Sequence, residues 1–563
     1  MDKITVYCDN LKGFYDCEPG TSLSALAEMT GTGCRYPVIA ALVDNMLKEL
    51  SFKIYTAHTV KFIDYTHPDG KRTFARSLSF VLQKAAVDIF PKYSLFLDYT
   101  LPNGLYGELR EKDGNGFRTV PLRAEDVTTL RRRMKEIIDS DLPFIKEKLP
   151  NGEAVRLFRD NGREEKAMLT ADMEKFFVSV YYLDGYPDTF YGPLLESTGA
   201  LSPFDLIPYS DGFCLQSPSS ENPEKITPYK YQDKLSSVFK ENAHWCSIIG
   251  AHGICSVNEM IRKGGAKDII AVAESLHERK YVYITDMIKA RKDSVRLVLI
   301  AGPSSSGKTT TSKRVALQCK VLGLNPVVLA MDDYFLDREH TPVDENGHYD
   351  FESVRALDID FLNSQINSLM DGEEVELPKF DFVAGKRVFN GRRIRMGKED
   401  ILIMEGIHAL NPELTKYMDG SRIFKIFASA LTSLSVDENN YISTADNRLL
   451  RRIVRDNLTR GISPEETILR WPSVRRGEEK NIFPYQENAD VMFNSSLLFE
   501  LPMLRYYVSP LLERIPPLSD AYPESVRLLK FLSYIMPLTQ DDVKCIPPTS
   551  IMREFIGGST FEY

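Results

Sequence analysis

Three short apolar runs in the second half of the chain predict strands that are buried on both faces. They occupy residues 296–301, 326–330 and 401–404, and each is followed within two residues by a glycine or an acidic residue. Continuous apolar runs of this length are typical of parallel sheets that are covered by helices, because such strands have no solvent-facing side. We therefore expect a helix-flanked parallel sheet in the C-terminal half of the chain.

The spacing of apolar residues also predicts helices. Val315, Cys319 and Leu322 recur at helical intervals and are followed by Gly323, so a helix with one apolar face is expected to end there. Residues 229–293 are read as a helical bridge, and a further helix is expected at residues 525–534.

The N-terminal segment has the pattern of a small α+β unit. It has a strand at residues 4–7, a turn at Pro19-Gly20, a helix near residues 23–27 and an apolar run at residues 38–43. The polar, proline-rich stretch at residues 217–223 indicates a loop or linker further along.

Composition narrows the class of protein. A chain of 563 residues is too long for one core and predicts about three or four domains. No uncharged apolar run reaches the roughly 18 residues that a membrane span requires, so we expect no membrane partner. Eight cysteines without a CxxC pair argue against a zinc ribbon or a disulfide framework. The beginning of the chain lacks a secretory pattern, so a cytoplasmic location is expected.

The first apolar run leads directly into a phosphate-binding motif. The motif reads Gly302-Pro303-Ser304-Ser305-Ser306-Gly307-Lys308-Thr309 and is followed by Thr310. Its glycines let backbone N–H groups surround an anion at a helix N-terminus, which carries a partial positive charge. Lys308 is expected to reach the β- and γ-phosphates of ATP, and the Thr309 hydroxyl to bind Mg²⁺. A chance serine- and glycine-rich turn is the weaker interpretation.

Acidic residues follow the other two apolar runs, at the sheet edge where ligands gather in α/β proteins. Asp332 is the expected general base for an attacking hydroxyl, and Asp333 is the second choice. Glu405 is the expected acid on the Mg²⁺ side. The alternative roles are a turn cap for one aspartate and an ordinary surface position for the glutamate.

Arginines later in the chain form a third feature. Helical spacing places Arg448, Arg452 and Arg455 on one face, where they could close over a transferring phosphoryl group. A charged run is more often a solvated helix face. Because a phosphate loop is present in the same chain, we favour the interpretation that these arginines form a lid.

These motifs together resemble the uridine kinase branch of the phosphoribulokinase/uridine kinase family. The resemblance covers roughly residues 297–490 and rests on the following segments in order: the phosphate loop, Asp332-Asp333-Tyr334-Phe335, Tyr349-Asp350-Phe351, Phe380-Asp381-Phe382, Glu405-Gly406-Ile407 and residues 448–461. It implies Asp332 as base, Glu405 beside Mg²⁺, Arg452 and Arg455 in the lid, and Asp350 at the ribose hydroxyls.

The positions that read the nucleobase in uridine kinases differ here. The resemblance places Phe380, Gly385, Ile462 and Arg470 where that family uses tyrosine, histidine, arginine and glutamine. Losing hydrogen-bonding side chains weakens discrimination of a pyrimidine, so uridine itself is not assured as the acceptor.

The first 215 residues resemble the front of threonyl-tRNA synthetases. Residues 1–62 are similar to a TGS domain, and the segments 76–80 and 188–194 are similar to the editing domain. The resemblance implies a histidine and cysteine cluster at four positions, which here are Arg76, Phe80, Phe190 and Leu194. The hydrolytic chemistry is therefore expected to be lost. A structural or dimerising role is preferred over RNA binding, which the net charge of -9 does not promote.

The expected fold is a multidomain α/β protein with a C-terminal P-loop NTPase-type parallel sheet and flanking helices, preceded by two α+β domains. The expected divisions are residues 1–62, 63–215, a linker and bridge at 216–293, a kinase domain at 294–500 and a helical extension at 501–563. The expected function is ATP- and Mg²⁺-dependent phosphorylation of a hydroxyl on a nucleoside-like small molecule by a homo-oligomer. A sugar, polyol or cofactor-precursor kinase and an ATP-gated regulatory protein are the alternatives.

Overall fold

The structure is a computed structural model that describes residues 3–102, 104–113, 116–173, 175–343, 347, 349–381, 384–416, 418–432 and 434–562. Phe382 of the Phe380-Asp381-Phe382 motif lies outside these residues.

The N-terminal unit is a mixed five-stranded sheet with the order β2-β1-β7-β4-β5. Its core contains Val6, Leu26 and Phe62, so apolar side chains from two strands meet one helix. Ser22 caps that helix by accepting a hydrogen bond from the Ala25 N–H. The elements are β1 (Ile4–Cys8), β2 (Gly13–Cys17), β3 (Thr21–Ser22), α1 (Leu23–Thr30), β4 (Val38–Val43), β5 (Met46–Lys48), β6 (Lys53–Ile54) and β7 (Thr59–Asp64).

The second unit packs helices against antiparallel sheets. In one sheet the order is β10-β9-β15-β14, with β8 also paired to β9, and the other has the order β11-β12-β13. The elements are α2 (Pro68–Ile89), β8 (Ser94–Leu101), β9 (Gly104–Asp113), β10 (Gly116–Val120), α3 (Ala124–Asp139), β11 (Ile145–Pro150), α4 (Asn151–Asp160), α5 (Glu164–Asp172), β12 (Phe177–Leu183), β13 (Tyr186–Asp188), β14 (Asp205–Tyr209) and β15 (Gly212–Gln216).

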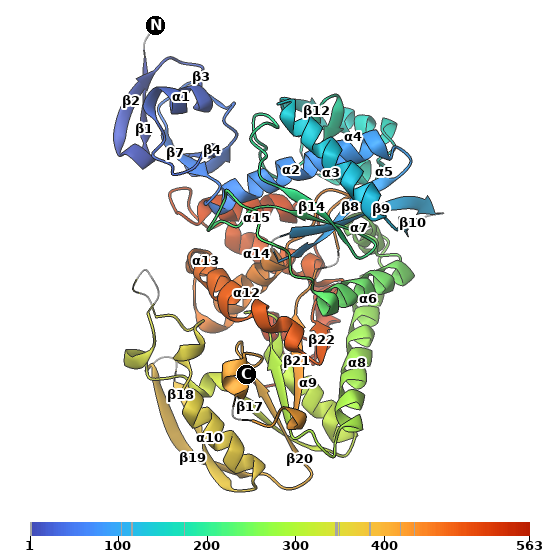
Figure 1. Ribbon diagram of the computed structural model, residues 1–563, viewed down its shortest axis with the longest axis vertical. Coiled ribbons are helices and arrows are strands. Elements are labelled where there is room, and N and C mark those ends of the chain that lie inside the picture. Colours follow the sequence, from blue (N-terminus) through green and yellow to red (C-terminus); the bar gives the residue numbers. More distant parts are fainter. Residues whose placement is uncertain are drawn as a thin grey trace.

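Helices α6 (Asp233–Ile249), α7 (Ile254–Arg262) and α8 (Ala266–Ala290) connect this unit to the C-terminal sheet. The long helix α8 runs along one side of the lower half of the molecule (Figure 1). Tyr281, Ile284 and Ile288 of α8 belong to the same core as the strands of that sheet, so the bridge is part of the packing.

The C-terminal sheet is parallel throughout, with the order β17-β20-β16-β21-β22. Along β16, Val298 and Ile300 lie in one core while Leu297 and Leu299 lie in another, because successive side chains point to opposite faces. The two-faced burial expected from the apolar runs is confirmed, and so is the fold class. The strands are β16 (Leu297–Ala301), β17 (Asn325–Ala330), β20 (Asp400–Glu405), β21 (Ile423–Ser429) and β22 (Val491–Asn494).

Helices and one hairpin surround this sheet. The helices are α9 (Lys308–Val321), α10 (Ile359–Met370), α11 (Pro412–Thr415), α12 (Thr444–Arg460) and α13 (Pro464–Asn481). The hairpin consists of β18 (Glu374–Asp381) and β19 (Lys386–Arg395) and is antiparallel.

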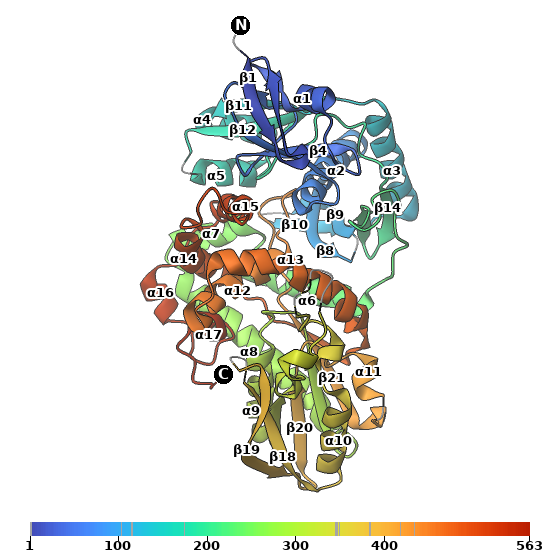
Figure 2. The same cartoon turned by 90° about the vertical axis from the view of Figure 1, so that its left-hand side faces the viewer.

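The last part of the chain folds back on the sheet domain. It contains α14 (Glu500–Leu512), α15 (Tyr522–Leu532), α16 (Gln540–Lys544) and α17 (Arg553–Ile556). Helix α15 begins before the expected residue 525, because Pro523 is accepted in the first helical turn. The C-terminus lies beside α9 in both views (Figures 1 and 2), and the Lys313 ammonium on α9 donates to the Glu562 carbonyl.

Partly buried ion pairs join the parts of the molecule. Arg527 of α15 contacts Asp446 of α12 and Glu524, and Glu524 also pairs with Arg72 of α2. Among the described residues, no helix has the length and apolar character needed to cross a bilayer.

Candidate active site

The phosphate loop connects β16 to α9. A Cβ on Gly302 would lie 2.0 Å from the Ala428 carbonyl oxygen, so only glycine fits beside β21. Gly307 has φ +77°, in the left-handed region, and α9 begins at the next residue. The glycines therefore let the chain turn sharply from the strand into the helix.

Two hydroxyls in the loop have unmet hydrogen-bonding capacity. Ser305 and Ser306 are buried, and neither Oγ has a partner in the described part of the chain. A buried polar atom without a partner is costly, and a phosphate oxygen would satisfy it. The loop and the first turn of α9 thus fit an anionic ligand.

Lys308, Thr309 and Glu405 meet at the ends of β16 and β20. The Lys308 ammonium donates to the Pro303 carbonyl at 3.1 Å, and the Thr309 hydroxyl donates to Glu405 Oε1 at 2.8 Å. Burial raises the pKa of Glu405 to about 7, against the opposing effect of Lys308, and Asp332 raises it further. An adjacent divalent cation would favour the ionised carboxylate.

Mg²⁺ would need more than protein ligands here. No group of three or more His, Cys, Asp or Glu side chains suited to a metal is found within the residues that the structure describes. Mg²⁺ commonly takes one or two protein groups and completes its shell with phosphate oxygens and water. Thr309 and Glu405 fit that smaller role.

The two aspartates after β17 have different surroundings. Asp333 Oδ1 accepts the Phe380 N–H at 3.2 Å and pairs with Lys379 at 3.3 Å. Asp332 has no side-chain hydrogen bond within the described residues and is exposed to solvent. Desolvation by the surrounding protein raises the pKa of Asp332, while Lys308 lowers it. Asp332 thus remains available to a ligand, whereas Asp333 is engaged in the fold.

Asp350 and its neighbour Glu352 also differ. Asp350 Oδ1 accepts the Glu352 N–H at 3.1 Å and so stabilises its own loop. Burial raises the pKa of Glu352 to about 7, with Arg452, Lys308 and Asp332 among the charges that act on it. Its Oε2 is buried without a partner in the described chain. The charges of the catalytic groups thus act on Glu352, while the ribose contact of Asp350 stays a prediction.

His408 is a buried histidine that the sequence interpretation missed. It is 1% exposed, and both ring nitrogens lack a hydrogen-bond partner among the described residues. Burial lowers its pKa to about 4, and Lys308 lowers it further. It is a neutral side chain beside the site, and a backbone interaction with Ser353 partly opposes the lowering of its pKa.

The four positions expected to read the acceptor have different surroundings. Phe380 is 3% exposed and packs edge-on against Phe335 at 5.8 Å, so it lies in the core. A Cβ at Gly385 would lie 2.6 Å from the Arg338 side chain. Ile462 is half-buried and Arg470 is exposed on α13. The part that Phe380 and Arg470 play in binding stays a prediction.

The arginines of α12 divide into two kinds. Arg452 donates to the Ser304 hydroxyl at 3.1 Å, and both Arg452 and Arg455 pair with Asp456. Arg448 does not join them in an open clamp, because it is fully buried and paired with Glu478. The expectation for Arg448 is therefore corrected, since helical spacing gives the face of a residue but not what covers it.

The Arg448–Glu478 pair holds the phosphate loop. Arg448 donates to the Ser304 carbonyl at 3.1 Å, and Glu478 Oε1 accepts the Ser304 N–H at 3.0 Å. Arg475 also pairs with Glu478, at 3.0 Å. Both backbone groups of Ser304 are thus fixed by side chains from α12 and α13.

The four synthetase-like positions pack together in the second unit. Phe80 and Phe190 form an edge-to-face pair at 5.2 Å, and Leu194 is fully buried. Arg76 donates to the Pro193 carbonyl at 3.1 Å. Apolar contacts and a structural hydrogen bond occupy these four positions, so none of them carries a side chain suited to bind a metal or to act as a general base.

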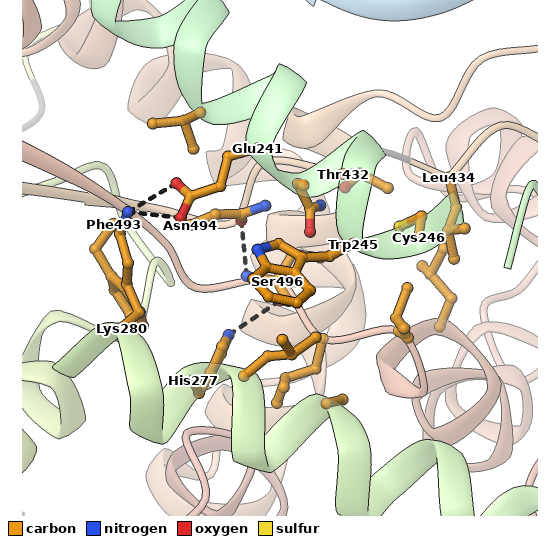
Figure 3. A pocket seen from close by; sticks show the side chains of 17 residues that line it. Glu241, Trp245, Cys246, His277, Lys280, Thr432, Leu434, Phe493, Asn494 and Ser496 are labelled. Carbon is orange, nitrogen blue, oxygen red and sulfur yellow. Dashed lines mark hydrogen bonds and ion pairs between the residues drawn. The ribbon is translucent and has the colours of Figure 1, made fainter. Parts of the chain in front are cut away.

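A separate pocket lies between α6, α8 and the end of β22 (Figure 3). His277 donates to the Ser496 carbonyl at 3.1 Å, and Lys280 pairs with Glu241 at 2.7 Å. None of the residues expected at the active site lines it. The imidazole of His277 and the charges of Lys280 and Glu241 are thus already paired, so we place the chemistry at the phosphate loop.

Comparison with known proteins identifies the family of the domain that carries the phosphate loop. The model of the Phosphoribulokinase / Uridine kinase family matches residues 297–497. The chain is 30% identical over 198 residues to the "Uridine kinase" of Staphylococcus aureus strains JH9 and Newman, a match that covers 35% of this chain and 86% of each relative.

The chain therefore belongs to the phosphoribulokinase/uridine kinase family through its C-terminal domain. That membership makes it a phosphotransferase of the nucleoside or sugar kinase kind, in a family that uses ATP and Mg²⁺.

Solved structures similar to this chain include one titled a putative fructose transport system kinase from Silicibacter sp. TM1040, at 19% identity. Another similar structure is titled a possible uridine kinase from Bacillus stearothermophilus, at 21% identity to this chain. Each match has a TM-score of 0.27 and covers 38% of this chain and 98% of the other.

Proposed function

We propose that the protein transfers the γ-phosphoryl group of ATP to a hydroxyl of a nucleoside or nucleoside-like small molecule. The observation that carries this proposal is the meeting of Lys308, the Thr309–Glu405 pair and Asp332 at one edge of the parallel sheet, where Asp332 has no side-chain partner among the described residues. A nucleotide-binding switch has no need of a free carboxylate facing the phosphate-binding lysine.

Each residue has a distinct task in this proposal. The loop from Gly302 to Thr310 binds the ATP phosphates, with Lys308 opposite their charge. Thr309 and Glu405 hold Mg²⁺, which when bound helps to neutralise the phosphates. Arg452, already at Ser304, and Arg455 stabilise the transferring group and exclude water.

Asp332 takes the proton of the acceptor hydroxyl. Its raised pKa makes the carboxylate a better proton acceptor than an ordinary aspartate, and its position near Lys308 keeps it close to the phosphoryl group. Asp333 is the weaker choice for the base because it binds the Phe380 N–H and Lys379.

We assign the acceptor subsite to Glu352 and His408, whose buried polar atoms have no partner among the described residues. A carboxylate and a neutral imidazole are suited to vicinal hydroxyls, which ribosides, sugars and polyols all carry. A sugar, polyol or cofactor-precursor acceptor is therefore the second candidate, favoured by the apolar setting of Phe380.

We propose a structural, dimerising role for residues 1–215 in a cytoplasmic homo-oligomer. The TGS-like and editing-like resemblance suits such a scaffold, because Phe80, Phe190 and Leu194 are packed in a core. Size-exclusion chromatography with light scattering tests the oligomer. Strong, salt-sensitive tRNA binding by the full chain would count against this role and for an RNA-associated protein.

The decisive experiment is an acceptor screen by ADP release. Nucleosides, sugars and polyols are each added to the full chain with Mg-ATP, and the same panel is run with Asp332→Asn. We expect one riboside-like compound to stimulate turnover in the wild type only. An acceptor that is phosphorylated at the wild-type rate by Lys308→Ala would contradict the mechanism. If the protein binds ATP but no compound in the panel stimulates turnover, a regulatory protein would be favoured.

A further inference from the structure

The C-terminal segment at residues 550–556 lies directly on the phosphate loop. Glu554 Oε2 accepts the Thr310 N–H at 3.2 Å and the Thr310 hydroxyl at 2.7 Å. A Cβ on Gly307 would lie 2.5 Å from Ile551 Cδ1, so this isoleucine covers the glycine at the start of α9. The segment is thus in contact with both ends of the sequence Gly307-Lys308-Thr309-Thr310.

The position of the Glu554 carboxylate is that of an anionic ligand. The first N–H groups of a helix have no partner inside the helix and carry partial positive charge, which favours an anion. In phosphate loops these N–H groups surround the α- and β-phosphates of a nucleotide. Here one of them is already bound to a carboxylate from a residue 244 positions later in the chain.

Glu554 also acts on the metal side of the site. Its charge is one of the influences that raise the pKa of Glu405, although burial has the largest effect. A second carboxylate this close to the phosphate site would repel a triphosphate. The contact therefore opposes nucleotide binding both by occupying a donor and by its charge.

The rest of the segment is firmly anchored. Ile551, Met552 and Phe555 are 1%, 0% and 0% exposed, and Phe555 lies under the guanidinium of Arg451 at 5.1 Å. Arg314 of α9 also donates to the Thr549 carbonyl at 2.8 Å. Removing three large apolar side chains from the core costs far more than turning one glutamate, so the movable part is the Glu554 side chain.

We propose that the C-terminal segment is an internal competitor for the nucleotide: the Glu554 carboxylate takes the place of a nucleotide phosphate on Thr310, and the side chain turns away when a nucleoside triphosphate binds. The inference rests on the proposed ATP site. It makes Glu554 a determinant of nucleotide affinity, supplied by the extension rather than by the phosphate loop.

The test measures Mg-ATP binding to the full chain by calorimetry, without any acceptor. Glu554→Gln keeps the shape and removes the charge, and Glu554→Ala removes both. The matched control is Glu513→Gln, which neutralises an exposed glutamate at the end of α14. We expect the Kd to fall about tenfold in both Glu554 variants, the size of one hydrogen bond to a charged group, and to stay unchanged in the control.

Each other result is informative. An unchanged Kd in both Glu554 variants would refute the competitor while leaving the ATP site in place. A higher Kd in the Glu554 variants would also refute the competitor role and would make Glu554 a supporting ligand on the metal side. If neither the wild type nor any folded Glu554 variant binds Mg-ATP, the proposed function itself fails, and melting curves of each variant identify those that are folded.

Discussion

Replacing Arg448 by methionine should destabilise the C-terminal domain and loosen the phosphate loop. The Arg448 side chain is 1% exposed and that of its partner Glu478 is 0% exposed. The pair makes two hydrogen bonds, of which the one from Arg448 Nη2 to Glu478 Oε2 is 2.7 Å long. Burial alone would raise the pKa of Glu478, but Arg448 and Arg475 hold it below its ordinary value. Arg448→Met leaves that carboxylate buried with only the partly exposed Arg475 as a cation.

Removing one partner of a buried ion pair costs about 3–5 kcal/mol, because the other charge stays buried. For a domain of this size we expect the melting midpoint to fall by the order of 10 °C. The difference in stability between the variant and the wild type should shrink as the pH falls towards 5. In the wild type, the lowered pKa of Glu478 means that its ionised form stabilises the folded state above the unfolded pKa. In the variant, protonation of Glu478 removes the unpaired buried charge.

A second substitution separates the charge effect from loop anchoring. Arg448→Met combined with Glu478→Met replaces the pair by apolar groups, which is often neutral for stability. The double variant should regain most of the lost melting midpoint, yet the backbone N–H and C=O of Ser304 would lack their side-chain partners, so Mg-ATP binding should remain weak. The reasoning is refuted if the single variant melts like the wild type, or if the double variant melts no higher than the single one.

Three further predictions concern catalysis, acceptor binding and the pH dependence of stability. Asp332→Asn should lower kcat by about 10²–10⁴-fold with little change in Mg-ATP affinity, while Asp333→Asn should lose less, as steady-state kinetics will show; the reverse order would make Asp333 the base. Glu352→Gln should raise the KM for the acceptor identified in the screen by about tenfold and leave the KM for ATP unchanged; equal effects on both would place Glu352 elsewhere. Burial would raise the pKa of Glu524, but Arg527 and Arg72 lower it to about 2. The ionised Glu524 therefore stabilises the folded state above its unfolded pKa, and this stabilisation is lost as the pH falls from about 4.5 towards 2. Melting curves of Glu524→Gln should lack this part of the pH dependence, and curves parallel to the wild type would disprove it.

The parallel sheet, the phosphate loop and its helix could be predicted from the sequence alone. These features depend on local patterns: buried strands give continuous apolar runs, and the left-handed turn at Gly307 needs glycine. The acidic residues after β17 and β20 could be placed at the same sheet edge, because parallel strands end together. Glu352 could have been found from the sequence as well, since it directly follows the Tyr349-Asp350-Phe351 motif.

Which of these residues are available to a ligand depends instead on how distant elements pack together. Asp332 differs from Asp333 because β18 brings Phe380 and Lys379 to one of them and not to the other. Arg448 leaves the predicted lid because α13 supplies Glu478, and Thr310 meets Glu554 because the end of the chain returns to α9. Such partners lie far apart in the sequence, and no local pattern encodes a contact that exists only once the separate elements have packed.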